Sequence, residues 1–271
     1  MSSLRCSKRK GGLKVRIDLN SDMGESFGRY KLGYDEEVLK YVSSANIACG
    51  LHAGDPLVME RTVKEAISRG VGIGAHPGYP DLQGFGRRSM VMSPEEVEAF
   101  VLYQIGALYA FVRSHGGSLR HVKPHGALYT DAYNAASRGD ESLSRAIANA
   151  VKRFDPSLIL VGLAGSKMVD VWRRMGMRVA EEVFADRAYN PDGTLVSRSH
   201  PGAVIRDPDE VVRRTIRMVK DREVVAIDGT VIRGLSFDTI CVHGDTPTAL
   251  ELVKRIREAL DKEGIEVKPL E

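Results

Sequence analysis

The chain has 271 residues, and its 39 Lys and Arg against 36 Asp and Glu give a formal net charge of +3. With 43% hydrophobic and 28% charged residues, it has the composition of a folded globular chain, which excludes the disordered and fibrous classes. No stretch approaches the roughly 18 uninterrupted apolar residues of a membrane span, and no apolar signal segment follows the basic N-terminus. Three scattered cysteines cannot form a disulfide framework. We therefore expect a cytoplasmic protein without a membrane partner.

The positive charge belongs to the N-terminal segment. Residues 1–14 carry five basic residues and no acidic one, so the rest of the chain is weakly acidic. We expect residues 1–13 to be a disordered basic tail and residues 14–271 to form one domain, because no linker or internal repeat divides them. Aromatic residues are not interleaved with basic ones, so we expect no nucleic-acid partner.

Short β-type runs alternate with amphipathic helical runs along the chain. The predicted strands cover residues 14–19, 45–49, 71–75, 119–123, 158–163, 179–184 and 239–242. Helix starts are indicated by Asp55-Pro56, Ser93-Pro94 with Glu96, Asp207-Pro208 and Thr246-Pro247. An Asp-Gly turn between alternating apolar residues predicts a small hairpin insertion at 224–235. This order predicts a parallel sheet with crossover helices.

The alternation of residue types along each strand helps to decide whether seven βα units close as a barrel or lie open as a doubly wound sheet. In the first strand Val15, Ile17 and Leu19 alternate with polar residues, and in the third strand apolar residues alternate with Gly72, Gly74 and His76. A doubly wound sheet would be apolar on both faces, whereas a second phase of small and polar residues suits a barrel interior. We predict a seven-stranded parallel (β/α) barrel, with its polar candidates at the C-terminal ends of the strands.

The first strand leads into an acidic segment, DLNSDMGE, at residues 18–25. Its carboxylates could ligate a divalent ion or supply a general base, or they could simply form a solvated acidic loop. His52 and His76 each follow a strand and are surrounded by glycines, which let backbone and ligand approach closely. Together with an aspartate they suit a metal site or an acid–base pair. Asp55, in contrast, is predicted to cap a helix.

Later strands end in further polar groups. Lys123 and His125 are two residues apart and share one strand face. A buried lysine needs an anion, which would be either a substrate or an internal glutamate. The last two strands of the predicted barrel contribute Glu182, Asp186, Arg187, His243 and Asp245, and Arg198 follows in a loop. No nucleotide-binding fingerprint occurs, although GLAGSK at 162–167 could hold a phosphate.

Six long motifs, taken together, resemble the LamB/YcsF family over roughly residues 15–260. They are DLNSDMGESFG (18–28), SSANIACGLHAGDP (43–56), GVGIGAHPGYPDLQGFGRR (70–88), VKPHGALY (122–129), EVFADRAY (182–189) and CVHGDTP (241–247). The resemblance implies a barrel related to polysaccharide deacetylases. It also implies that the chain is the A component of an ATP-hydrolysing 5-oxoprolinase. Together with the B and C subunits, that enzyme converts 5-oxo-L-proline to L-glutamate. The N-terminal extension departs from the family pattern and inherits no role from it.

The implied reaction gives each candidate an expected role. We expect Asp18, His52, His76, His125, Asp186 and His243 to be catalytic, and Asn20, Lys123, Glu182, Arg187, Arg198 and Asp245 to bind substrate. ATP is the expected cosubstrate, and the candidate ligands of a divalent ion such as Mg²⁺ are Asp18, Asp22, Glu25, His52 and His76. The sequence also leaves open whether the chain forms a homo-oligomer. The alternatives are a stand-alone metal-dependent deacetylase acting on N-acetylated sugars and a non-catalytic subunit that binds the lactam.

Overall fold

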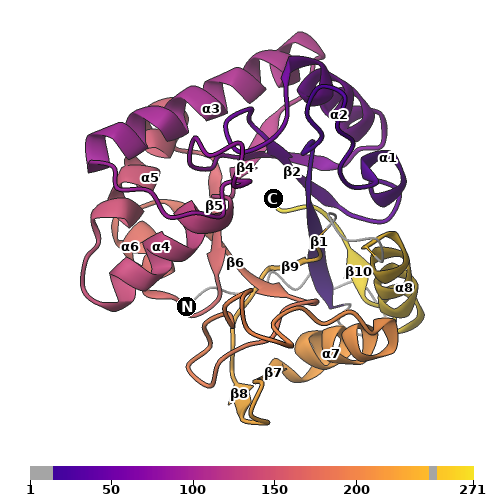
Figure 1. Ribbon diagram of the computed structural model, residues 1–271. Helices are drawn as coiled ribbons and strands as arrows, with labels where there is room; N and C mark the ends of the chain where they lie inside the picture. The colour runs from indigo at the N-terminus through magenta and orange to yellow at the C-terminus, as the bar shows by residue number, and fades with distance from the viewer. Residues whose placement is uncertain (1–14, 244–248) are drawn as a thin grey trace.

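The computed structural model describes residues 15–243 and 249–271, which form a closed barrel of parallel strands ringed by helices (Figure 1). The elements are β1 (Arg16–Met23), α1 (Asp35–Val38), β2 (Ser44–Ala48), α2 (Pro56–Ser68), β3 (Gly72–His76), α3 (Pro94–Ser114), β4 (Leu119–Val122), α4 (Gly126–Ser137), α5 (Ser142–Phe154), β5 (Ile159–Leu163), α6 (Lys167–Arg174), β6 (Arg178–Phe184), α7 (Pro208–Asp221), β7 (Glu223–Val225), β8 (Val231–Arg233), β9 (Thr239–Cys241), α8 (Ala249–Lys262) and β10 (Glu266–Val267). The basic tail, Asp245 and the Thr246-Pro247 helix start lie outside the described residues. Among the helices described, none combines the length and hydrophobicity needed to cross a bilayer.

The barrel closes in the order β1-β2-β3-β4-β5-β6-β9, and β9 pairs back with β1. Thr239 at the start of β9 is in register with Asp18 on one side and Glu182 on the other. The seven predicted strands and the parallel barrel are therefore confirmed. β7 and β8 form the predicted hairpin. Two features were not predicted: β1 continues to Met23, and the two-residue strand β10 pairs with the start of β1.

Helix starts follow the predicted capping chemistry. Asp55 accepts the backbone N–H groups of Leu57 and Val58 at the start of α2, which confirms its capping role. Ser93 and Glu96 form a complete capping box at α3. Asp207 caps α7 by accepting the N–H of Asp209. These caps fix where each helix leaves the barrel rim.

In β1 the apolar and polar phases separate as predicted, whereas β5 is apolar on both phases, with Leu160 in the main core and Ile159 and Val161 in a smaller cluster. Ile17 and Leu19 are buried in the apolar layer between the strands and the helices, while Asp18 and Asn20 are buried inside the barrel. On the β1, β2 and β4 side, the interior is therefore lined by polar side chains. Asn46 on β2 donates to the Asn20 side chain, and His121 on β4 contacts Asn46 at 2.7 Å.

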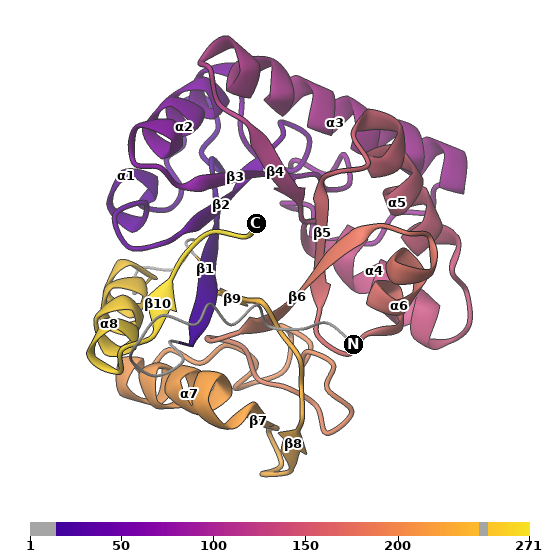
Figure 2. The ribbon, with the colours of Figure 1, turned by 180° about the vertical axis from the view of Figure 1, so that it is seen from behind.

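The C-terminal segment closes the N-terminal end of the barrel. Leu270 packs in a small apolar cluster with Ile159, Val161 and Ala180. Seen from behind, the C-terminus lies over the middle of the barrel (Figure 2). Since this end is plugged by apolar side chains, polar chemistry is left to the opposite end, where the strands finish.

Candidate active site

Four ligand-type side chains meet where β1–β4 end, and we call this set the histidine cluster. Its members are Glu25, His52, His76 and His125. All four are buried, and one ligand atom from each lies within 4.8 Å of the other three. The rings of His52 and His125 stack with centroids 3.7 Å apart, and His76 meets both edge-on. The structure therefore brings together residues that are far apart in sequence but equivalent in their βα units.

Backbone carbonyls fix how two of these imidazoles point. His76 Nδ1 donates to the carbonyl of Lys123 at 2.7 Å, and His125 Nε2 donates to that of Phe85 at 2.9 Å. Each ring therefore presents its other nitrogen to the centre of the cluster, where His76 Nε2 and His125 Nδ1 lie 3.0 Å apart. Two lone pairs at this distance repel each other unless a proton or a metal ion lies between them.

His52 gives a second indication that this cluster is suited to a cation. Neither of its ring nitrogens makes a hydrogen bond with the described residues, although the ring is fully buried, and Glu25 Oε1 lies 3.5 Å from Nε2. Burial is the main cause that holds the pKa of His52 well below its usual value, so the ring is neutral at pH 7. Burial likewise lowers the pKa of His125. A buried neutral imidazole without a hydrogen bond is unfavourable unless it ligates a metal.

The donor set fits a transition metal better than Mg²⁺. Three imidazoles and one carboxylate form the tetrahedral nitrogen–oxygen set that Zn²⁺ and related ions take, whereas Mg²⁺ takes six oxygens. A second group of potential ligands, Asp22, Cys241 and His243, lies alongside. Asp22 touches the cluster, with Oδ2 3.3 Å from His76 Nε2. The site could therefore hold a metal ion through Glu25, His52, His76 and His125.

Beneath the histidine cluster lies a buried ionic layer centred on Lys123. Its Nζ is 3.1 Å from both Asp22 Oδ1 and Glu182 Oε2. Burial disfavours the ammonium, but Asp22 and the other acidic neighbours outweigh it and raise the pKa of Lys123 well above its usual value. For Asp22, burial is likewise outweighed by His76 and Lys123, so its pKa lies well below the usual range. Lys123 thus forms an internal ion pair, which was one of the two alternatives that the sequence left open for this residue.

His243 and Asp186 form a pair on the other side of the barrel mouth, at the ends of β9 and β6. His243 Nδ1 lies 2.9 Å from Asp186 Oδ2, and both side chains are buried. The ring of His243 also stacks against Phe184 at 5.6 Å. A carboxylate that holds Nδ1 leaves Nε2 as a base, which is the geometry of general acid–base catalysis.

The structure does not bring Asp18 to this site. Its carboxylate accepts hydrogen bonds from the hydroxyl groups of Ser43, Ser44 and Thr239, deep in the barrel. Asp18 lines a cavity of about 290 Å³ at the plugged end of the barrel instead. Burial raises its pKa to about 6. Asp18 is thus placed to organise the barrel floor.

The remaining predicted substrate-binding residues do not join the histidine cluster. Asn20 accepts from Asn46 below the ionic layer. Arg187 is buried and donates to the carbonyls of Ala203 and Val196, while Arg198 is exposed. The Gly165 amide of the predicted phosphate loop donates to Glu181.

Two aromatic residues at the site were not identified from the sequence. Burial and the adjacent Glu182 carboxylate raise the pKa of Tyr129 well above its usual value. Phe85 lies edge-on to His52 and His125, with centroid distances of 5.8 and 5.2 Å. Their motifs, KPHGALY and GFGRR, were recognised, but Tyr129 lies in the first turn of α4 and Phe85 in a loop, so neither belongs to the strand alternation that identified the other candidates.

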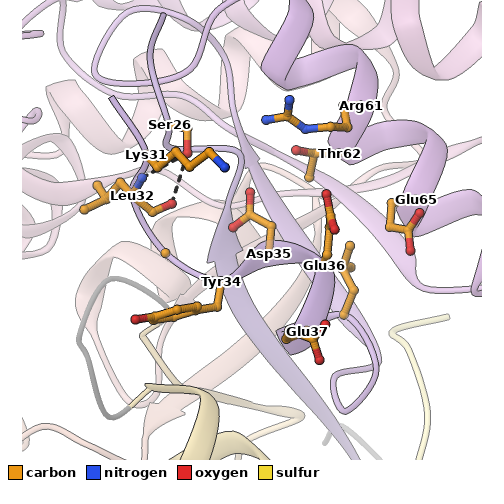
Figure 3. Close-up of a pocket in the computed structure, with 12 residues that line it drawn as sticks. Ser26, Lys31, Leu32, Tyr34, Asp35, Glu36, Glu37, Arg61, Thr62 and Glu65 are labelled. Atoms are coloured by element: carbon orange, nitrogen blue, oxygen red, sulfur yellow. Dashed lines mark hydrogen bonds between the residues drawn. The ribbon is translucent and has the colours of Figure 1, made fainter. Parts of the chain in front are cut away.

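A larger pocket of about 580 Å³ lies outside the barrel, between α1 with its preceding loop and the flank of α2. Figure 3 shows Asp35, Glu36, Arg61 and Glu65 around it. Asp35 accepts the backbone N–H of Gly24 at 2.9 Å, next to Glu25 of the histidine cluster. Asp35, which lines the pocket, therefore anchors the loop that carries Glu25, whereas none of the three histidines lines the pocket.

Fold and site together define a (β/α)-barrel protein with a buried metal-capable cluster and a His243–Asp186 pair at the C-terminal strand ends, where barrel enzymes place their sites. The chain belongs to the LamB/YcsF family, whose model matches residues 17–271. It is 59% identical over 256 residues to a Pyrococcus furiosus protein named as the A component of 5-oxoprolinase, covering 94% of this chain and 98% of the relative.

Solved structures agree with this assignment. The chain resembles the crystal structure of a lactam utilization protein from Thermus thermophilus, with a TM-score of 0.87, 50% identity, and coverage of 94% of this chain and 100% of that one. The catalytic domain of a peptidoglycan N-acetylglucosamine deacetylase from Eubacterium rectale matches with a TM-score of 0.51 at 12% identity, covering 98% of this chain and 93% of that one. The latter match shows the shared fold alone.

Proposed function

We propose that the chain is the A component of an ATP-dependent 5-oxoprolinase. The observation that carries the proposal is the 59% identity to a Pyrococcus furiosus protein with that 5-oxoprolinase name, which extends over 94% of this chain. The buried cluster and the His243–Asp186 pair give that assignment a chemical centre. The relative is named as one subunit of several, which supports partners that we assign as the B and C subunits. We assign the chain to the cytoplasm, since the two buried cysteines are free thiols and the proposed reaction uses ATP.

The reaction needs ATP because a lactam resists attack by water. Phosphorylating the carbonyl oxygen of 5-oxo-L-proline, with release of ADP, makes that carbon electrophilic. Water then adds to the carbon, and the ring C–N bond breaks as the nitrogen takes up a proton. A second water releases phosphate, so two waters are consumed in forming glutamate, ADP and phosphate.

The chain's residues would divide this work by position. His243, oriented by Asp186, would take the proton from water and return it to the departing ring nitrogen. Glu25, His52, His76 and His125 would hold a divalent ion, which when bound would polarise the reacting carbonyl. Lys123 would keep Asp22 ionised beside His76, while Arg187 and Arg198 lie on the side of Asp186 and would supply cations for the substrate carboxylate.

The test is reconstitution with both products measured. ATP hydrolysis and glutamate release are assayed with this chain alone, with only the B and C subunits, and with all three. We expect coupled formation of ADP and glutamate only in the complete mixture. Undiminished glutamate release by B and C without this chain would contradict a role for it.

A stand-alone deacetylase is the second candidate, favoured by the metal-capable cluster. Assaying acetate release from N-acetylglucosamine oligomers, with Zn²⁺ and without ATP, separates the two functions. We expect no acetate release. A lactam-binding subunit without catalytic residues would instead keep full complex activity after His243→Ala.

A further inference from the structure

The second group of potential ligands beside the histidine cluster already contains a cation that belongs to the chain. Its members, Asp22, Cys241 and His243, offer ligand atoms that all lie within 4.8 Å of one another. An oxygen, a sulfur and a nitrogen at this spacing form a donor set that Zn²⁺ takes in proteins. Lys123 Nζ, however, lies 3.1 Å from both Asp22 Oδ1 and Cys241 Sγ. The ammonium therefore lies among the donors that a metal ion would need.

The neighbours of the Lys123 ammonium resemble the coordination shell of a metal ion. Besides the two contacts above, Glu182 Oε2 lies 3.1 Å from Nζ and Asn20 Oδ1 lies 3.4 Å from it. The Phe184 ring covers a further side, with its centroid 5.2 Å from Nζ. All of these side chains are buried. The cation and its acidic neighbours therefore stabilise one another, and removing either is costly.

Asp22 connects this ammonium to the histidine cluster. Its Oδ1 faces Lys123 Nζ, while its Oδ2 lies 3.3 Å from His76 Nε2. Oδ1 also accepts a hydrogen bond from Asn46 Nδ2 at 2.9 Å, which holds the carboxylate in this orientation. A carboxylate that presents one oxygen to each of two neighbouring cation positions is the bridge of a two-metal site. Here the side chain of a lysine takes one of the two positions.

A divalent ion would have to share these donors with the ammonium of Lys123. Two cations in one buried set of donors repel each other strongly, because the protein interior screens charge poorly. Moving the ammonium aside would leave it buried without an anion, since only 3% of the Lys123 side chain is exposed. Both routes to a second metal ion are therefore unfavourable.

We propose that the Lys123 ammonium takes the place of a second metal ion at the barrel mouth, so that the chain holds a single divalent transition metal ion and excludes metal from Asp22, Cys241 and His243. The inference rests on the proposed function in one respect, which is that the histidine cluster holds that ion. It goes further because an ammonium cannot bind and ionise a water molecule as a metal ion does. The second cation at the mouth thus contributes fixed charge without Lewis-acid chemistry.

The first experiment leaves Lys123 unchanged. Metal-free wild type and Cys241→Ser are loaded with Co²⁺ and desalted, and their metal content and absorption spectra are compared. Cobalt bound to a thiolate, the form in which cysteine ligates metals, gives an intense charge-transfer band in the near ultraviolet. We expect one Co²⁺ per chain in both proteins and no thiolate band in either. A band that Cys241→Ser abolishes, or two ions of which that variant loses one, would overturn the inference.

Lys123→Ala should open the second site, because it leaves the neighbouring carboxylates and the Cys241 thiol without their shared cation. We expect this variant to bind one Co²⁺ more per chain than the wild type and to show the thiolate band. The band should disappear in Lys123→Ala/Cys241→Ser. Lys152→Ala, which removes an exposed lysine of α5, is the control and should match the wild type. A folded Lys123→Ala protein that gains no metal ion would contradict the inference.

The metal assignment of the histidine cluster can fail separately from this inference. A wild-type chain that binds no Co²⁺ would contradict that assignment, while the gain of one ion in Lys123→Ala would still support the role of the ammonium. If Lys123→Ala does not fold, the first experiment decides: equal metal content without a thiolate band supports the inference, and a band that depends on Cys241 contradicts it. Neither measurement depends on turnover of 5-oxoproline.

Discussion

His243 Nδ1 lies between the two carboxylate oxygens of Asp186, 3.0 Å from Oδ1 and 2.9 Å from Oδ2. The two residues come from neighbouring strands of the barrel, β9 and β6, which pair in parallel. Burial would raise the pKa of Asp186, but His243 outweighs this effect and holds it below the usual value. An ionised aspartate therefore fixes the tautomer of His243 and leaves Nε2 to accept a proton.

Asp186→Asn should lower kcat for glutamate release by at least about 100-fold, because the amide cannot stabilise the imidazolium that forms during proton transfer. The variant keeps the size of the side chain, so its melting temperature should change little. Asp192→Asn, on the exposed loop that follows, is the matched control and should be fully active. Activity of Asp186→Asn within about twofold of the wild type would show that the pair is not the base.

Adding Zn²⁺ to metal-free protein should raise its melting temperature, and EDTA should reverse the rise, since a ligand that binds only the folded state stabilises it. His76→Ala should abolish this response, whereas His200→Ala, at an exposed position, should keep it. Because burial holds the pKa values of His52 and His125 well below 6.5, protons should compete with the metal only weakly between pH 8 and 6. An equal rise in His76→Ala would contradict the assignment of the cluster.

Periodicity explains why much of the site could be found from the sequence. Alternation along a strand places residues two apart on one face, so His76, Lys123 and His243 were expected inside one barrel. Periodicity does not report depth along the barrel axis. Asp18 and Asp22 share a face, yet they are four residues apart, which is about 13 Å of strand. That spacing puts Asp22 beside His76 and Asp18 on the barrel floor.

Partners across the barrel depend on strand stagger, which no local pattern encodes. Lys123 was expected to face an anion, but only the closed barrel shows that Asp22 and Glu182 take that place. Phe85 and Arg87 lie in a loop whose shape is set by contacts with His125 and Ala127, which come from a later βα unit. Their motif identified a family segment without indicating where the side chains would lie.

Lys123→Met should lower the free energy of unfolding by about 3–5 kcal/mol, because it leaves the Asp22 and Glu182 carboxylates buried without their shared cation. Chemical denaturation at pH 7 measures the loss. Lys152→Met on the exposed face of α5 is the control and should cost less than about 0.5 kcal/mol. A stability loss no larger than that of the control would show that the ionic layer is not needed to hold the barrel together.

Asp18→Asn should change how stability depends on pH. The folded-state pKa of Asp18 is about 6, above the ordinary value of 3.8, so the folded protein binds the proton more tightly than the unfolded chain. The wild type therefore loses stability as the pH rises from 4 to 6, by up to about 3 kcal/mol relative to the asparagine variant, which cannot ionise. Denaturant titrations of both proteins at pH 4, 5, 6 and 7 give this difference. A difference that does not vary with pH would contradict the raised pKa.

Gly86→Ala and Gly28→Ala separate backbone strain from steric exclusion at the cluster. Both glycines have left-handed backbones, with φ of 61° and 55°, so each substitution costs about 1–2 kcal/mol. A Cβ at Gly28 would meet nothing within 4 Å, whereas one at Gly86 would lie 2.7 Å from His52 Cβ and 2.8 Å from His125 Cδ2. Only Gly86→Ala should therefore displace the two histidines, adding about 1–3 kcal/mol of destabilisation and removing the Zn²⁺-dependent rise in melting temperature. Equal stability of the two variants, with the Zn²⁺ response intact in both, would mean that the loop can move away from the cluster.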